Sequence, residues 1–235
     1  YIPGAGEAFR IMSIAGTTTT TGALDTPDSG TTVYGAQGGW LHKFDVLYNS
    51  SLGGGDGNDL VLQRSADTTA YPYEWGIDAS GAWSAADAAL ENWRHYVQPD
   101  GADAHVLFGS AVTAPQTVTL DAPKTAGHLV FDNANAYLLD GAAANALTLA
   151  TTAGDATVTV SSGAHTIAAP VALANDLSVD IANAADSLIM TGDLSGAAGG
   201  LTKTGPGTLT LDGDNTYPGA TTVGGGRLSV NGTHT

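Results

Sequence analysis

The stretch from Gly199 to Gly232, GGLTKTGPGTLTLDGDNTYPGATTVGGGRLSVNG, decides the fold of this chain. Short runs of Thr, Leu and Val alternate in it with Gly and Asn-Gly turns, at a spacing of about ten residues. Strands this short do not form a globular domain alone, but they bury a continuous core when successive coils stack. The stretch therefore predicts a β-solenoid, which is built by repetition and not around a catalytic pocket.

The same alternation of apolar runs and turn residues extends back through residues 113–235. If three strands make one coil, each coil takes roughly 25 residues, and about five coils follow at a rise of ~4.8 Å each. A β-sandwich also has strands at this spacing, so it is the alternative fold. The expected strands are Thr117–Leu120, His128–Phe131, Tyr137–Leu139, Leu147–Leu149, Thr157–Val160, His165–Ile167, Leu177–Ile181, Leu188–Met190, Leu201–Lys203, Thr208–Leu211, Thr221–Val223 and Arg227–Val230.

The composition agrees with a thin core between closely spaced sheets. Hydrophobic residues make up 43% of the chain but aromatic residues only 7%, and Gly occurs 32 times. The formal net charge is −16, from 23 acidic and 7 basic residues. Most of the acids are Asp, which is typical of turns because its side chain bonds the local backbone. Nucleic acid is excluded as a partner, since neutralising phosphates needs a basic stripe.

Three zones differ in composition, and we divide the chain into 1–64, 65–112 and 113–235. The first is an N-terminal β segment, the second a Trp-rich linker or cap, and the third the solenoid. In the second zone, Ser84 and Asp87 predict a capped helix that ends at Trp93. No segment approaches the roughly 18 apolar residues that a membrane span needs. The chain starts at Tyr1 without a signal-peptide pattern, as expected of a mature or excised piece of a longer precursor.

Residues 199–232 closely resemble the autotransporter-associated β-strand repeat of bacterial passenger domains. Trp75 to Phe108 looks like the entry segment of large bacterial surface proteins with these repeats, and Phe44 to Leu62 looks like the hairpin that closes such units. The resemblance implies a right-handed parallel β-helix, secreted or displayed on the cell surface, without catalysis in the repeat. The closing hairpin precedes the repeat, so the chain resembles the end of one unit joined to the start of the next. We expect an internal window of a tandem protein, or a last coil completed by another copy.

Trp75, Trp83 and Trp93 form a candidate ligand site in the second zone. Their rings suit a platform for stacking on sugars. They equally suit an aromatic cap, because the terminal coil of a solenoid exposes an open core and an unpaired edge. We interpret them as the cap, and glycan stacking stays open as the alternative.

A candidate calcium site lies at residues 54–62, GGDGNDLVL, which fit the calcium-binding nonapeptide GGxGxDxUx. Asp56 and Asp59 would supply hard oxygen ligands there. A complete site needs two successive copies, and only one is present, so a Gly-rich hairpin turn is the alternative. Asp212 and Asp214 could suggest a glycosidase carboxylate pair, but they lie inside the repeat beside Gly213, and we interpret them as turn residues.

These observations predict a non-catalytic, extracellular, structural or adhesive solenoid rather than an enzyme. Because the two ends of a solenoid are complementary edges, we also expect copies to associate head to tail into a surface filament. The alternative function is a β-helix module that binds, or less readily cleaves, a surface carbohydrate. We expect no cofactor other than calcium.

Overall fold

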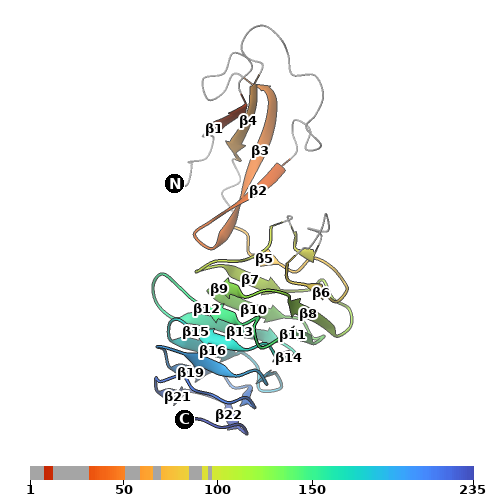
Figure 1. The fold of residues 1–235 in the computed structure, drawn as a ribbon. Helices are drawn as coiled ribbons and strands as arrows, with labels where there is room; N and C mark the ends of the chain where they lie inside the picture. Colours follow the sequence, from red (N-terminus) through yellow and green to blue (C-terminus); the bar gives the residue numbers. More distant parts are fainter. Residues whose placement is uncertain (1–7, 13–31, 51–58, 66–69, 85–91, 95–96) are drawn as a thin grey trace. The chain divides into compact units, whose positions relative to one another are not determined.

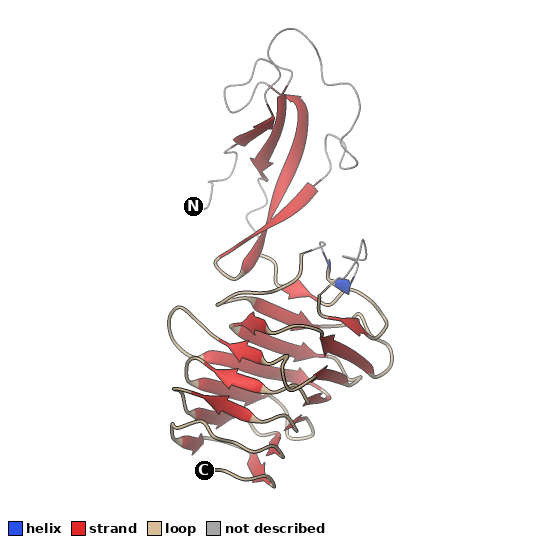
Figure 2. Ribbon diagram, viewed as in Figure 1, coloured by secondary structure: helices blue, strands red, loops and turns tan. Residues whose placement is uncertain are grey.

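The computed structural model describes residues 8–12, 32–50, 59–65, 70–84, 92–94 and 97–235 (Figure 1). The chain divides into two compact units, Tyr1–Tyr71 and Pro72–Thr235. The described residues form strands, turns and loops, with one short helical turn near Trp93 and no α-helix (Figure 2). Most of the helix predicted after Ser84 lies outside the described residues.

The first unit contains an antiparallel sheet in the order β1-β4-β3-β2. Gly38 and Gly39 join β2 to β3 with φ of 56° and 77°, which only glycine adopts readily and which suits a two-residue hairpin. β3 and β4 also pair antiparallel, with Val46 opposite Leu62. The strands are β1 (Ala8–Met12), β2 (Thr32–Gln37), β3 (Trp40–Ser50) and β4 (Asp59–Arg64).

The second unit is built from three parallel sheets, whose strands follow one another down the stack in chain order (Figure 1). Sheet one contains β5 (Tyr73–Glu74), β7 (His105–Phe108), β10 (His128–Asp132), β13 (Ala156–Ser162), β16 (Leu177–Ile181), β19 (Leu201–Thr204) and β21 (Thr221–Val223). Sheet two contains β6 (Gly81–Ala82), β8 (Gln116–Leu120), β11 (Tyr137–Gly141), β14 (Ala164–Ile167), β17 (Ser187–Met190), β20 (Thr208–Leu211) and β22 (Arg227–Val230). Sheet three contains β9 (Lys124–Ala126), β12 (Leu147–Leu149), β15 (Val171–Leu173) and β18 (Leu194–Gly196).

This arrangement is a parallel β-solenoid, and it confirms the predicted fold class. The sandwich alternative is wrong, because sandwich sheets are antiparallel and every strand pair of the second unit is parallel. The strand between His105 and Phe108 belongs to the stack, so the solenoid already includes part of the Trp-rich zone.

Register keeps equivalent residues in columns although the coils differ in length. Leu129 lies opposite Val158 and Lys203 lies opposite Val223, so one circuit takes 29 residues and another takes 20. The predicted 25 residues per coil falls between these values. The inward residues therefore stay paired, while the difference lies mainly in the side of the coil between sheets two and one, where the longer circuit includes β12 and the shorter includes no strand of sheet three.

The core consists of columns of inward side chains, one from each coil. From Ala156 to Val160 of β13 and throughout β16, every second residue is buried, as expected of strands with one face inside. An aromatic column runs through the earlier coils, where Phe108 stacks on Phe131 at 4.9 Å and Phe131 stacks on His165 at 4.9 Å. Later coils continue with aliphatic residues such as Leu209 and Leu211, both almost fully buried.

Corners of neighbouring coils lie so close that glycine is required at several of them. A Cβ atom on Gly232 would lie 2.0 Å from the carbonyl oxygen of Gly213, and one on Gly213 would lie 2.5 Å from that of Gly192. Such contacts leave no room for a side chain. The glycines of the repeat therefore serve close stacking as well as turning.

Turn carboxylates join one coil to the next. Asp176 accepts a hydrogen bond from the backbone N–H of Gly200 at 2.7 Å, and Asp186 accepts one from Gly163 at 3.0 Å. Asp193 accepts one from the N–H of Asp214 at 2.9 Å. The turn role predicted for the acidic residues is thus observed, with the difference that all three also bond the neighbouring coil; Asp186 in addition accepts a hydrogen bond from the amide of Asn183 in its own turn.

Candidate functional site

The three candidate tryptophans come together in the first coil of the solenoid. Trp75 follows β5 and Trp83 follows β6, and the exposed fractions of Trp75, Trp83 and Trp93 are 0%, 0% and 2%. The ring of Trp93 lies edge-on to both others, with centroids 5.3 Å from Trp75 and 4.9 Å from Trp83. Phe108 of the next coil extends the cluster, at 6.0 Å from Trp83.

Hydrogen bonds fix two of these rings. The indole N–H of Trp83 donates to the carbonyl of Pro99, and that of Trp93 donates to the carbonyl of Trp83, both at 2.8 Å. The indole N–H of Trp75 is buried without a hydrogen-bond partner among the described residues. Buried rings with partnered N–H groups are typical of an aromatic core, and Trp83 and Trp93 meet this description.

The segment Asn92–Arg94 closes the edge of the first coil. Trp93 pairs antiparallel with Trp75, and the N–H of Gly76 donates to the carbonyl of Asn92 at 2.8 Å. The amide of Asn92 donates to the carbonyl of Ala82 at 2.9 Å, so the segment reaches both sheets. Because the ring faces pack inside and this edge is partly occupied, the geometry supports the cap interpretation over a sugar platform.

An imidazole pair lies on the outer face of sheet one. His105 and His128 occupy adjacent strands, and their rings stack at 4.2 Å. Burial and the neighbouring imidazole lower the pKa of His105 to about 4, and burial lowers that of His128. Hydrogen bonds from Thr152 lower the pKa of the Asp103 carboxyl. Because burial disfavours the charged form of both rings, His105 and His128 are neutral near pH 7.

His165 is a buried polar residue that the sequence did not distinguish from its neighbours. Its Nδ1 accepts a hydrogen bond from the N–H of Tyr137 at 3.1 Å, and its Nε2 lies 2.8 Å from the carbonyl of Ser162. The ring is therefore neutral with its proton on Nε2, and burial lowers its pKa. The side chain replaces a backbone acceptor at this point of the stack.

The described residues contain no group of three or more His, Cys, Asp or Glu side chains placed to hold a metal ion. Asp56 lies outside the described residues, and Asp59 is the first residue of β4, opposite Ser50. Calcium binding at residues 54–62 stays a prediction.

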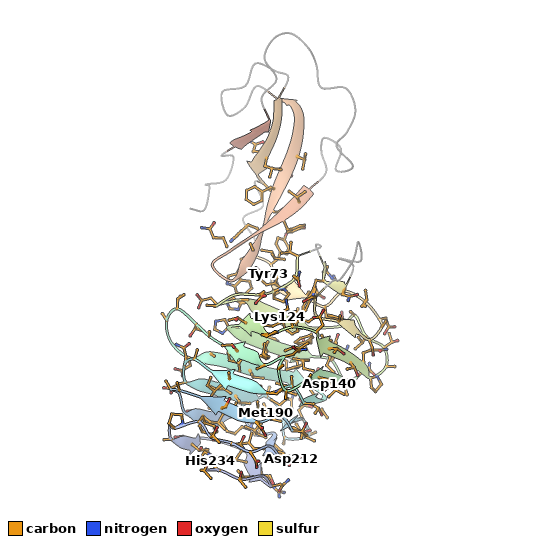
Figure 3. The ribbon with its side chains drawn as sticks, viewed as in Figure 1. Tyr73, Lys124, Asp140, Met190, Asp212 and His234 are labelled. Carbon is orange, nitrogen blue, oxygen red and sulfur yellow. The ribbon has the colours of Figure 1, made fainter. Side chains whose placement is uncertain are left out.

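Asp212, labelled in Figure 3, and Asp214 follow β20 and bond the coil that follows. The carboxylate of Asp212 accepts a hydrogen bond from the amide of Asn231 at 2.8 Å, and that of Asp214 accepts one from the hydroxyl of Thr233 at 2.6 Å. Their oxygens thus serve coil stacking, which supports the turn interpretation over a glycosidase pair.

The repeat forms the last two coils, β19–β20 and β21–β22. Val223 and Val230 are 49% and 47% exposed, although their partners Lys203 and Leu211 are buried. The outer strand edges of β21 and β22 are open in the described residues. Lys203 is fully buried, which was not predicted from the sequence; its spacing of two residues from Leu201 in the strand is the signal that could have indicated an inward position.

Comparison with known proteins identifies this part of the chain. Residues 201–230 match the family described as passenger-associated-transport-repeat. The adhesin BmaC autotransporter of Brucella suis biovar 1 (strain 1330) is 35% identical over 159 residues, which are 66% of this chain and 4% of that adhesin. The chain thus spans a small part of that relative. No solved structure matches.

Among the described residues, no helix has the length and hydropathy to cross a membrane. The matched repeat comprises the last two coils of a parallel solenoid, and the similarity to the adhesin extends over most of the chain. Together these findings make the chain an autotransporter passenger-like repeat protein, of the secreted and surface-exposed kind.

Proposed function

We propose that this chain is a structural and adhesive segment of an extracellular passenger, with no catalytic role of its own. The observation that carries the proposal is the uninterrupted stacking of the second unit, in which two sheets each contain seven parallel strands. Each coil contacts mainly its neighbours, so such a stack extends a surface in one direction. The relative with 35% identity is itself named an adhesin.

The outer faces of the sheets suit adhesion more than catalysis. Thr157, Ser178 and Thr202 follow one another in one outward column of sheet one. Hydroxyl groups in register offer many weak hydrogen-bonding positions over a regular surface. A long protein that makes many such contacts at once binds more tightly than any single contact would allow. Asp212 and Asp214, the carboxylates considered as a glycosidase pair, accept hydrogen bonds from the next coil.

The proposal includes self-association through the last coil. Val223 and Val230 lie on open strand edges there, and a further coil would cover them. That coil can come from another copy or from sequence beyond residue 235. A head-to-tail filament also needs an open edge on the first coil, and Asn92 and Trp93 occupy part of that edge.

Adhesion is tested by coating beads with the purified chain and measuring binding to epithelial cells and to extracellular matrix. We expect saturable binding above that of beads coated with an unrelated solenoid. Equal binding by both kinds of bead would overturn the adhesive role. A glycan array run in parallel tests the carbohydrate alternative.

Self-association is tested by light scattering after size exclusion over a hundredfold range of concentration. We expect oligomers that dissociate on dilution and are abolished by Val223→Lys with Val230→Lys. Thr119→Lys places a charge on an exposed position of sheet two and serves as the control. A parent chain that stays monomeric throughout the range would contradict self-association.

A further inference from the structure

Lys203 interrupts an otherwise apolar column of sheet one. It lies between Val179 of the preceding coil and Val223 of the following coil, and it is 0% exposed. Burial lowers the pKa of its ammonium, and the described residues include no ion pair to it. A buried charge costs stability relative to an apolar residue of similar volume. Its position therefore requires a reason other than core packing.

The ammonium lies where the corners of two coils meet. It donates to the carbonyls of Thr204 and Gly205 in its own corner, the latter at 2.9 Å. It also donates to the carbonyl of Gly225 in the next coil at 3.4 Å. The two corners are in close approach, since a Cβ atom on Gly225 would lie 3.1 Å from the carbonyl oxygen of Gly205. Lys203 thus joins two consecutive coils of the repeat.

Within β21 itself, side chains other than Lys203 give little to define register, although Leu228 and Val230 of the next strand lie opposite Leu209 and Leu211. β21 consists of Thr221, Thr222 and Val223, and Gly224 to Gly226 follow it. Val223 is its one large apolar residue. A shift of two residues keeps the same side chains inward, so an apolar pattern this short specifies register weakly. The earlier pair β16 and β19 differs, because Leu177 lies opposite Leu201 in addition to the Val179 column.

We propose that Lys203 sets the register of the repeat, by binding the carbonyl of Gly225 and so fixing β21 against β19. A single buried polar residue fixes register in coiled coils at a cost in stability, and the same logic applies between stacked coils. Lys203 is here a positioning residue. The role concerns how one coil recognises the next, and it does not depend on adhesion.

Paired cysteines report the register directly, because the chain contains no native cysteine. Thr202 and Thr222 are Cα partners on the outer face, so Thr202→Cys with Thr222→Cys should form a disulfide in the native register. Thr202→Cys with Gly224→Cys should form one only after a two-residue shift, since the native displacement along the strand is roughly 6–7 Å. Both pairs are oxidised in the parent and in Lys203→Met, and yields are measured by mass spectrometry.

In Lys203→Met we expect the 202–224 yield to rise about tenfold, the change expected on losing one charge-assisted hydrogen bond, and the 202–222 yield to fall. Leu177→Met makes a volume-conserving substitution at a buried position of sheet one in the preceding coil and should leave both yields unchanged. A folded Lys203→Met chain with parental yields overturns the proposal. If Lys203→Met does not fold, the same yields are measured in Lys203→Gln, whose side chain keeps a weaker, neutral hydrogen-bond donor. It should then raise the 202–224 yield in part, and parental yields in Lys203→Gln would overturn the proposal equally.

Discussion

At the scale of the residue, a few buried polar side chains distinguish this solenoid from a stack with a purely apolar core. His165, Lys203 and Asn215 are all almost fully buried, and each hydrogen-bonds backbone groups of its own or a neighbouring coil. Side chains in these positions take over bonds that the backbone ladder does not make. Substitution there removes a specific link between coils as well as volume from the core.

His165 should make stability depend on pH. Its folded-state pKa lies below the usual 6.5 because of burial, so the neutral ring is favoured in the folded state. The stabilisation is present above about pH 6.5 and is lost as the pH falls through the lowered pKa. Protonating Nδ1 would also break its bond to the N–H of Tyr137. His105 and His128 act in the same direction.

Thermal unfolding from pH 7.5 to 4.5 checks this expectation. The melting temperature of the parent should fall with pH, and that of His165→Leu should fall less steeply. Parallel curves for the two proteins would show that His165 does not titrate in this range.

Trp83 should act as a structural residue. Replacing a buried tryptophan with alanine costs about 3–5 kcal/mol of unfolding free energy, and Trp83→Ala also leaves the carbonyl of Pro99 without its donor. Trp83→Phe keeps most of the apolar volume and should cost less. Chemical denaturation measures both variants. Loss of glycan binding with unchanged stability would instead support the carbohydrate alternative.

At the scale of the element, the structure is a set of short strands joined by corners in close contact. Strands with clear alternation were predictable from sequence to the residue, as Leu177–Ile181 and Thr208–Leu211 show. β9, β15 and β18 of sheet three were not predicted. Each has three residues and includes Ala or Gly, whereas the equally short β12 and β21, which were predicted, consist only of Leu, Thr and Val.

The tryptophan cluster and the hydrogen bonds around it were predictable only in part, because some of these contacts join residues distant in sequence. Clustering of the tryptophans followed from composition, and their burial is consistent with the cap. The pairing of Trp75 with Trp93, and the carboxylate bonds between coils, depend on which coils become neighbours. That information lies in residues distant in sequence, so local patterns do not contain it.

Gly213→Ala tests the close contact between corners. Its Cβ atom would lie 2.5 Å from the carbonyl oxygen of Gly192, so the coils must separate locally. We expect a loss of roughly 1–3 kcal/mol of unfolding free energy, as for other overpacked sites. Gly101→Ala is the matched control, because a Cβ atom there meets nothing within 4 Å. Similar denaturation midpoints for the two variants would refute the steric argument.

At the scale of the whole molecule, stability should vary along the stack of the second unit. Each coil is stabilised by its neighbours, as in other repeat proteins. The first coil has the tryptophan cluster and the Asn92–Arg94 segment, whereas the last coil has neighbours on one side only among the described residues. Opening should therefore begin at β21 and β22.

Hydrogen exchange followed by mass spectrometry checks this expectation. Amides of β21 and β22 should exchange fastest within the second unit, and those of β13 and β16 slowest. Uniform exchange along the stack would indicate that the unit opens in one cooperative step. Repeating the measurement at higher protein concentration shows whether self-association protects the last coil.

The unequal circuits of the solenoid have a consequence for how such a protein can diversify. The 29-residue circuit and the 20-residue circuit both keep their inward residues paired, because most of the difference lies outside sheets one and two: the longer circuit includes the sheet-three strand β12 and the shorter includes no strand of that sheet. A corner such as residues 150–155 can thus be lengthened or exchanged while the strands stay in place. Evolution or design can therefore introduce new contact loops along one edge of the stack without changing the inward residues that specify the fold.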